Sequence, residues 1–296
     1  MKVGVVGLGS MGMGAALNLA RAVQQVEGCE IRQEAWAELE AAGGHCVASA
    51  DALPEGLEAL VVFVVNAAQA EQVLAAALPG LAGDAVVLNC TTVAPEAARA
   101  LARTVEQTGR RYLDAPVSGG AGAARSGQMT VMASGSKEAF DRAAPVLEAI
   151  AGKVWRLGDV PGVGSTVKMV NQLLAGVHIA AAGEALALGI RAGADPQTLF
   201  DVISSSAGSS WMWQNRVPHI LEGDDTPRSA VNIFVKDLGI VLDQARALTF
   251  PLPMASAAHQ LFLAASAAGH GARDDAFVIR VWEALAGIEL PKPASR

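Results

Sequence analysis

Glycines crowd the first turn of the chain, directly after a short apolar run. The stretch KVGVVGLGSMGMG (residues 2–14) sets a G-x-G-x-x-G pattern between a predicted strand and a predicted helix. The first glycine of such a turn permits a tight bend, the second lets a pyrophosphate reach the backbone, and the third lets helix and strand pack closely. The helix N-terminus favours the anion. The stretch predicts a dinucleotide site, and its plain alternative is a glycine-rich turn without a ligand. The candidate contacts are Gly7, Leu8, Gly9, Ser10, Met11 and Gly12.

Short apolar runs alternate with helical stretches through the first half of the chain. Strands that are apolar throughout are typical of a parallel sheet covered by helices on both faces. We therefore predict an α/β fold with a Rossmann-type, doubly wound, mostly parallel sheet. The strands after the first are expected near 27–31, 59–65, 85–92, 111–118, 129–135 and 153–158.

The pattern changes at residues 159–165, after which no convincing strand follows. Residues 165–192 lack proline and read as one long helix, and Asp195-Pro196 is a typical start signal for the next helix. Further helices are expected near 196–205, 209–221, 229–248, 253–268 and 273–286. We predict three parts: a Rossmann domain over 1–162, a long interdomain helix over 163–192, and an all-helical substrate and oligomerisation domain over 193–296.

Composition excludes several classes of function. The 296 residues carry a net charge of −7 and no basic cluster, which argues against a nucleic-acid partner. Cys29, Cys46 and Cys90 have spacings that fit neither a zinc site nor a disulfide framework, so buried thiols in a reducing cytosol are expected. The five histidines form no ligand-like pattern, and no metal is expected. No signal peptide precedes Gly7, and no apolar run reaches the roughly 18 residues of a membrane span. A cytoplasmic protein is predicted.

An acidic residue ends the predicted second strand. Glu30 lies 18 positions beyond Gly12, where a carboxylate can accept hydrogen bonds from the adenosine ribose and would repel a 2′-phosphate. This position favours NAD over NADP. Arg32 is the opposing signal, because a guanidinium could pair with a 2′-phosphate.

Four stretches resemble one family, the β-hydroxyacid dehydrogenases. Residues 7–20 resemble its cofactor motif and residues 114–135 (DAPVSGGAGAARSGQMTVMASG) its substrate motif. Residues 162–174 (GVGSTVKMVNQLL) resemble its catalytic motif, and residues 234–245 its later lysine segment. Two further stretches are most similar to the L-threonate dehydrogenase branch of the family.

Lys168 is the central residue of this resemblance. In the family, the matching lysine is the catalytic acid/base, and a lysine facing an apolar cleft can exchange protons near neutrality. Asn171 and Gln172 lie three and four residues further along the same predicted helix, so all three side chains share a face. The family usually has asparagine where this chain has Gln172, which reaches one methylene further.

The resemblance also implies roles at the ends of other elements. The loop Ser118, Gly119 and Gly120 is expected to hold the substrate carboxylate through N–H and hydroxyl groups. Thr92 matches the nicotinamide-side threonine, and Val65 and Asn66 are further cofactor candidates at the same sheet edge. Lys236 is either a contact of the nicotinamide end or the partner of a surface ion pair with Asp237.

One position near the first helix also departs from the family. Val23 stands where a glycine usually ends that helix, and valine does not easily adopt the left-handed conformation. We expect a distorted or mobile turn over 22–26.

The predicted activity is hydride transfer between a small hydroxy acid and NAD, with a threonate-like C4 acid favoured and NADP the second choice of cofactor. The acid would bind between the domains of a homodimer or homotetramer. Alternatives are 3-hydroxyisobutyrate dehydrogenase or tartronate semialdehyde reductase activity with either cofactor. An imine reductase, or a non-catalytic dinucleotide-binding protein, would usually lack Lys168.

Overall fold

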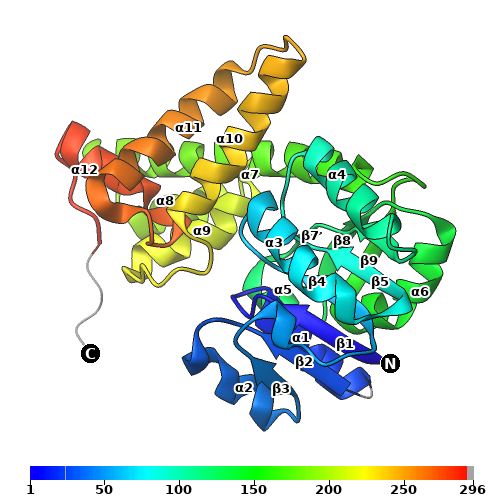
Figure 1. Ribbon diagram of the computed structural model, residues 1–296. Helices are drawn as coiled ribbons and strands as arrows, with labels where there is room; N and C mark the ends of the chain where they lie inside the picture. Colours follow the sequence, from blue (N-terminus) through cyan, green and yellow to red (C-terminus); the bar gives the residue numbers. More distant parts are fainter. Residues whose placement is uncertain (24, 292–296) are drawn as a thin grey trace. The chain divides into compact units, whose positions relative to one another are not determined.

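The computed structural model describes residues 1–23 and 25–291, and the chain forms two compact units, Met1–Met169 and Val170–Arg296 (Figure 1). The first unit is an α/β unit and the second is helical. Helix α7 (Val163–Arg191) crosses the division, so Lys168 belongs to the first unit, whereas Asn171 and Gln172 belong to the second.

The first unit is built on a parallel six-stranded sheet in the order β3-β2-β1-β4-β5-β6. The prediction of a Rossmann-type parallel sheet is confirmed. The short strand β3 was not expected, because three residues are too few to show an alternating pattern. The strands are β1 (Lys2–Val6), β2 (Gln25–Cys29), β3 (His45–Val47), β4 (Leu57–Val62), β5 (Leu81–Asn89) and β6 (Arg111–Asp114).

Helices cover both faces of this sheet, as the uniformly apolar strands predicted. Successive side chains of a strand point to opposite faces, so Val86 and Leu88 enter one core and Val87 enters the other. The first face carries α1 (Gly12–Ala22), α2 (Trp36–Ala41), α5 (Gly120–Arg125) and α6 (Lys137–Ile150), and the second carries α3 (Ala67–Ala77) and α4 (Pro95–Glu106).

A second, three-stranded sheet follows in the order β7-β8-β9, made of β7 (Val117–Ser118), β8 (Met129–Ala133) and β9 (Ala151–Arg156). The prediction of one strand over 111–118 is therefore wrong, since β6 ends at Asp114 and β7 pairs antiparallel with β8. Pro116 lies in the break, where its missing N–H cannot join a ladder.

The predicted distortion after α1 falls partly outside the described residues, because Gln24 is not among them. Val23 caps α1 in an extended conformation, with φ −118° and ψ 167°, and its N–H donates to the carbonyl of Leu19. Valine thus avoids the left-handed region, and β2 already begins at Gln25. Neither Val23 nor the start of β2 shows the expected distortion.

In the second unit, two hydrophobic clusters lie along α7. One packs Ile179 against α10 and α11, and the other packs Leu186 against α9. Helices α10 and α11 pack against each other (Figure 1). The Asp195 side chain caps the next helix by accepting from the N–H of Thr198 at 2.8 Å, which confirms the start signal. The helices are α8 (Pro196–Ser204), α9 (Trp211–Glu222), α10 (Val231–Ala247), α11 (Pro253–Ala265) and α12 (Val281–Ala286), with a π turn at Ser266–His270 and a 3-10 helix at Asp275–Arg280.

The expectation about membrane spans concerned uninterrupted apolar runs, whereas one helix qualifies by its mean hydropathy. Helix α7 has 29 residues and a mean hydropathy of 1.7 in its most apolar window, enough to cross a membrane by length and composition. Interrupting polar residues such as Asn171 and Glu184 hid this in the sequence. Of that window, 44% is buried inside the protein, and Ile179 and Leu186 of α7 belong to the two hydrophobic clusters of the second unit.

Candidate active site

The glycine turn between β1 and α1 has the geometry that its sequence predicted. Gly7 has a φ of +88°, and a Cβ there would collide with the carbonyl of Phe63. A Cβ at Gly12 would collide with the carbonyl of Gly7. At Gly9, by contrast, a Cβ would meet nothing within 4 Å. The first and third glycines thus serve the packing of strand and helix, and Gly9 leaves the open space that a pyrophosphate requires.

The remaining residues of this turn differ in their surroundings. Ser10 is exposed and Met11 is half-buried. Leu8 is buried, and its N–H donates to the Glu30 carboxylate at 3.0 Å. The described residues fit a dinucleotide phosphate at this turn.

Glu30 follows β2 directly, and only 8% of it is exposed. Its carboxylate accepts from the Arg32 guanidinium at 3.1 Å, from the Arg32 N–H at 3.1 Å and from Leu8. Burial acts to raise the pKa of Glu30, but the hydrogen bonds and charge of Arg32, together with the Leu8 amide, hold that pKa below its ordinary value. Glu30 is therefore a fixed anion beside the glycine turn. Arg32, with 55% of its side chain exposed, is ion-paired to it.

The ends of β4 and β5 carry the predicted nicotinamide-side residues. Thr91 ties the two strands together, because its hydroxyl accepts from the Val64 N–H at 3.3 Å and lies 3.4 Å from the Val62 carbonyl. Thr92 follows it and is half-buried. Asn66 caps α3 by accepting from the N–H of Gln69 at 2.9 Å.

Val65 is 49% exposed beside this cap. Thr92, Asn66 and Val65 therefore all follow the carboxyl ends of neighbouring parallel strands, the edge at which doubly wound sheets bind ligands.

The loop Ser118, Gly119 and Gly120 joins β7 to α5. Gly119 and Gly120 have φ values of +122° and +70°, a region that side chains disfavour. A Cβ on Gly119 would lie 2.6 Å from the Cβ of Ala123. The glycines are thus required by the backbone here, and both are exposed.

Lys168 lies in the second turn of α7, and only 7% of it is exposed. Burial of this degree sets it apart from an ordinary solvated helix lysine. The start of α7 contacts Asp114, at the end of β6. The Asp114 carboxylate accepts from the N–H of Ser165 at 2.8 Å and from its hydroxyl at 2.7 Å. Burial raises the pKa of Asp114, against the lowering effect of these hydrogen bonds.

In the second unit, Gln172 and Lys236 meet at one carboxylate. The Gln172 amide donates to Asp237 at 2.6 Å, and the Lys236 ammonium lies 2.7 Å from the other oxygen of Asp237. Gln172 also accepts from the Asn171 amide at 3.0 Å. The ion pair considered for Lys236 exists, but it is not a surface pair, since Asp237 is only 2% exposed.

Asp237 was considered as the surface partner of Lys236, and only its burial was unexpected. Two other residues, Asp114 and Ser165, joined these groups without being predicted. Both lie in the quoted motifs, but a carboxylate next to a strand end gives no sequence sign of burial. The signal that could have found them is the glycine spacing of GVGS, which indicates a close backbone contact at the start of α7.

The three cysteines are free thiols. Cys29 and Cys90 are buried and Cys46 is half-buried; burial raises the pKa of Cys29 and of Cys46 to about 11. Among residues 1–23 and 25–291, no group of three His, Cys, Asp or Glu could hold a metal ion.

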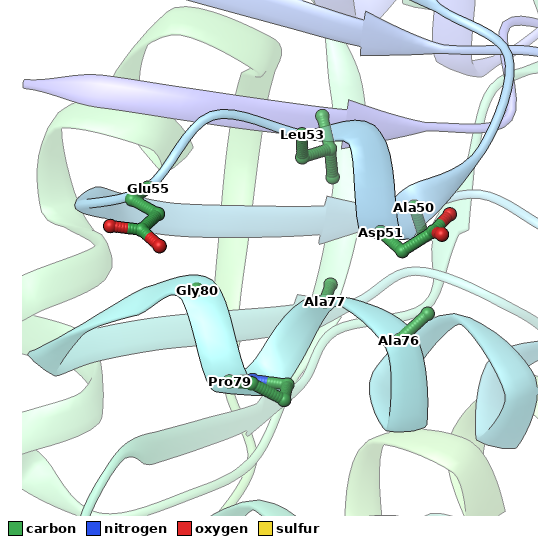
Figure 2. Close-up of a pocket in the computed structure, with 8 residues that line it drawn as sticks. All are labelled: Ala50, Asp51, Leu53, Glu55, Ala76, Ala77, Pro79 and Gly80. Carbon is green, nitrogen blue, oxygen red and sulfur yellow. The ribbon is translucent and has the colours of Figure 1, made fainter.

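A cavity of about 230 Å³ lies at the end of α3, with the carboxylates of Asp51 and Glu55 among small and apolar residues (Figure 2). None of the predicted site residues lines this cavity.

Two protein families match the chain, one after the other. Residues 2–158 match the NAD-binding domain of 6-phosphogluconate dehydrogenase. Residues 162–282 match the family described as NAD-binding of NADP-dependent 3-hydroxyisobutyrate dehydrogenase.

Individual relatives are similar over nearly the whole chain. An L-threonate dehydrogenase of Cupriavidus necator is 54% identical over 99% of this chain and 98% of its own length. A 3-hydroxyisobutyrate dehydrogenase of Pseudomonas aeruginosa is 34% identical over 88% of this chain and 90% of its own. The crystal structure of a Salmonella typhimurium protein described as 3-hydroxyisobutyrate dehydrogenase superposes with a TM-score of 0.91 at 50% identity, covering 95% of this chain and 99% of that one. The chain therefore belongs to the 3-hydroxyisobutyrate dehydrogenase-related family of β-hydroxyacid dehydrogenases and is an NAD(P)-dependent oxidoreductase that acts on a hydroxyl group.

Proposed function

We propose that this enzyme oxidises the hydroxyl group of a small polyhydroxylated acid of the L-threonate type, with NAD as the preferred cofactor and Lys168 as the general acid/base. The observation that carries the proposal is the burial of Lys168 on the first two turns of α7, in a unit whose sheet edge also bears an open glycine turn. The substrate class is supported by the 54% identity to an L-threonate dehydrogenase.

When bound, the nicotinamide supplies an acceptor for the hydride that leaves the carbon of the C–OH group. Lys168 takes the hydroxyl proton on its Nζ as the carbonyl forms, and it returns that proton in the reverse direction. Proton and hydride together balance the oxidation of an alcohol to a carbonyl.

The other residues would bind and orient. The N–H groups of Gly119 and Gly120 and the Ser118 hydroxyl would hold the substrate carboxylate, because the loop presents donors at a strand end. Asn171 and Gln172 keep the role of substrate contacts implied by the resemblance.

Cofactor binding would use three regions of the chain. Thr92, Asn66 and Val65 would lie along the nicotinamide, and Lys236 would approach its end. Glu30 would bind the adenosine ribose, which supports NAD. We place the enzyme in the cytoplasm, because its three thiols are unpaired and because residues of α7 pack in the hydrophobic clusters of the second unit.

The test is turnover of a panel of hydroxy acids with NAD and NADP, followed by the absorbance of the reduced nicotinamide. L-threonate should give the highest kcat/KM. A higher kcat/KM for 3-hydroxyisobutyrate than for L-threonate would instead support 3-hydroxyisobutyrate dehydrogenase activity. This second candidate function is favoured by the 50% identity to a protein described as 3-hydroxyisobutyrate dehydrogenase. Activity on none of the acids would refute both.

A further inference from the structure

We propose that Asp114 is a positioning residue: its buried carboxylate holds the first turn of α7, and through that turn Lys168, against the carboxyl edge of the sheet. The effect on catalysis rests on the proposed function, in which Lys168 is the general acid/base. Asp114 ends β6, is 0% exposed, and is 54 positions from Lys168 in the chain. It therefore acts through the backbone of α7 and does not touch a substrate.

The carboxylate accepts hydrogen bonds from two residues at the start of α7, Gly162 and Ser165. One oxygen, Oδ2, accepts from the N–H of Gly162 at 2.9 Å and from the N–H of Ser165 at 2.8 Å. The other oxygen, Oδ1, accepts from the Ser165 hydroxyl at 2.7 Å. Two N–H groups at a helix start, which helical bonding leaves unpaired, thus find their acceptor on a distant strand.

Ser134 provides a second tie to the same turn. Its hydroxyl accepts from the N–H of Gly164 at 2.9 Å and donates to Asp114 at 3.3 Å. The backbones of Asp114 and Ser134 also exchange two hydrogen bonds, at 3.0 and 2.8 Å. Strand ends from both sheets of the unit therefore hold one helix start.

Gly164 lies in close contact with the ends of β6 and β8. A Cβ at this position would lie 2.9 Å from the Asp114 carbonyl oxygen and 3.1 Å from its carboxylate, and it would collide with the carbonyl of Met132. The helix backbone therefore packs directly against the strand ends, and a side chain at this position would force them apart.

Lys168 follows Ser165 by three residues, about one helical turn. Displacement of the first turn therefore moves its side chain with it. Asp114 also lies four residues before Ser118, so the strand end that holds the start of α7 leads directly into the proposed substrate loop. Misplacement of a reacting group by about 1 Å can cost roughly a hundredfold in rate.

The experiment compares four variants: Asp114→Ala, Asp114→Asn, Ser165→Ala and the control Ser136→Ala. Asparagine can present its carbonyl to the two N–H groups and its amide to the Ser165 hydroxyl, so it replaces the carboxylate in shape. Ser136 caps α6 by accepting from the N–H of Ala139 at 3.2 Å, in the same unit but away from α7. It is thus a matched serine at another helix start.

The measurements are kcat and KM for L-threonate and the Kd of NAD from protein fluorescence, all at a temperature well below the melting temperature of each variant. Thermal unfolding is measured separately and gives that melting temperature. Asp114→Ala should lower kcat by at least about tenfold and leave the Kd of NAD within about twofold, because the glycine turn lies elsewhere. Asp114→Asn should restore kcat to within about threefold of the wild type, and Ser165→Ala should lower it by about threefold or more. Ser136→Ala should reduce stability, as loss of a cap does, without changing kcat.

A lower melting temperature with unchanged kcat in both Asp114→Ala and Ser165→Ala would overturn the proposal. A loss of kcat in Ser136→Ala as large as that in Asp114→Ala would overturn it too. Hydrogen exchange at the amides of residues 163–168 is measured in the same proteins. If the wild type oxidised no hydroxy acid, the proposed function would fail, and hydrogen exchange alone would test whether Asp114 holds the start of α7. Faster exchange at residues 163–168 in Asp114→Ala than in the wild type, without faster exchange in α6, would support that role. Unchanged exchange at residues 163–168 would refute it.

Discussion

At the scale of single residues, two side chains beside β2 bear on cofactor choice. Glu30 is held as an anion by the Leu8 amide and by Arg32, and its carboxylate is buried near the open space over Gly9. Arg32 is already ion-paired with Glu30, although 55% of its side chain is exposed to solvent. This arrangement disfavours NADP, because the buried Glu30 carboxylate would repel the 2′-phosphate of that cofactor and Arg32 is already paired.

We therefore expect kcat/KM to be at least about tenfold higher with NAD than with NADP, which corresponds to roughly 1.4 kcal/mol. Glu30→Ala should reduce this difference in kcat/KM, because it removes the repulsion of the 2′-phosphate and leaves Arg32 able to pair with that phosphate. Arg32→Ala is the control, since it should weaken NADP use further. Equal use of both cofactors by the wild type would contradict this assignment.

Lys168 carries the second prediction at this scale. Its replacement by alanine should lower turnover by roughly 10²- to 10⁴-fold, the usual contribution of a positioned acid/base, with the loss mainly in kcat. Arginine should not rescue it, because a guanidinium stays protonated at any working pH.

The control for Lys168 is Lys137→Ala, which removes a lysine with 77% of its side chain exposed and should leave kcat unchanged. Binding of NAD to the Lys168 variant, measured by fluorescence, should stay near the wild-type value. Retention of more than about a tenth of the activity, well above the expected range, would mean that another group is the base.

At the scale of elements, the joint between β6 and α7 contains a carboxylate that burial disfavours in its charged form. A carboxyl whose pKa is raised on folding adds stability at acid pH, and that contribution is lost as pH rises through its folded pKa. The charged form of Asp114 is thus a cost to the free energy of folding at neutral pH, and its hydrogen bonds can be kept by an uncharged isostere.

Asp114→Asn should accordingly be at least as stable as the wild type at pH 7, and the difference in unfolding free energy should shrink as pH falls toward about 4, near the ordinary carboxyl pKa. Urea unfolding across this pH range measures it. A variant that is less stable at pH 7 and approaches the wild type only in acid would show that the charge itself stabilises the joint.

At the scale of the whole molecule, α7 keeps an apolar face outside the core of the second unit. Val170 and Leu174 are each 50% exposed, and Leu188, fourteen residues further along the same helix, is 71% exposed. These positions follow helical spacing, so the three side chains share one face of α7, here called the stripe, with His178 between Leu174 and Leu188. Exposed stripes of this kind mark contact with another protein surface.

We expect a homo-oligomer in which this stripe is covered by a second copy. Light scattering at micromolar concentration should give a mass of at least twice the 30.3 kDa of the chain. Leu174→Glu should shift the distribution toward the monomer, whereas Leu285→Glu, at a position 73% exposed on α12, should not. A wild type that remains a monomer would leave the stripe unexplained and the expectation wrong.

The local sequence determined which elements form and where the glycine turn and the long helix lie. Glycine spacing, apolar runs and helix start signals are properties of neighbouring residues, so Gly7 with its positive φ and the cap at Asp195 could be predicted from a few positions each. Family resemblance added Lys168 to this set.

Tertiary structure alone decided the partners that lie far apart in the chain. Asp114 and Ser165 are 51 positions apart, and Gln172 and Asp237 are 65 positions apart. The sheet of β7 to β9 is likewise separate from that of β1 to β6, although the strands of both look alike in sequence. A carboxylate carries no local sign of the donors that will surround it, because burial and pairing arise only when distant segments pack together.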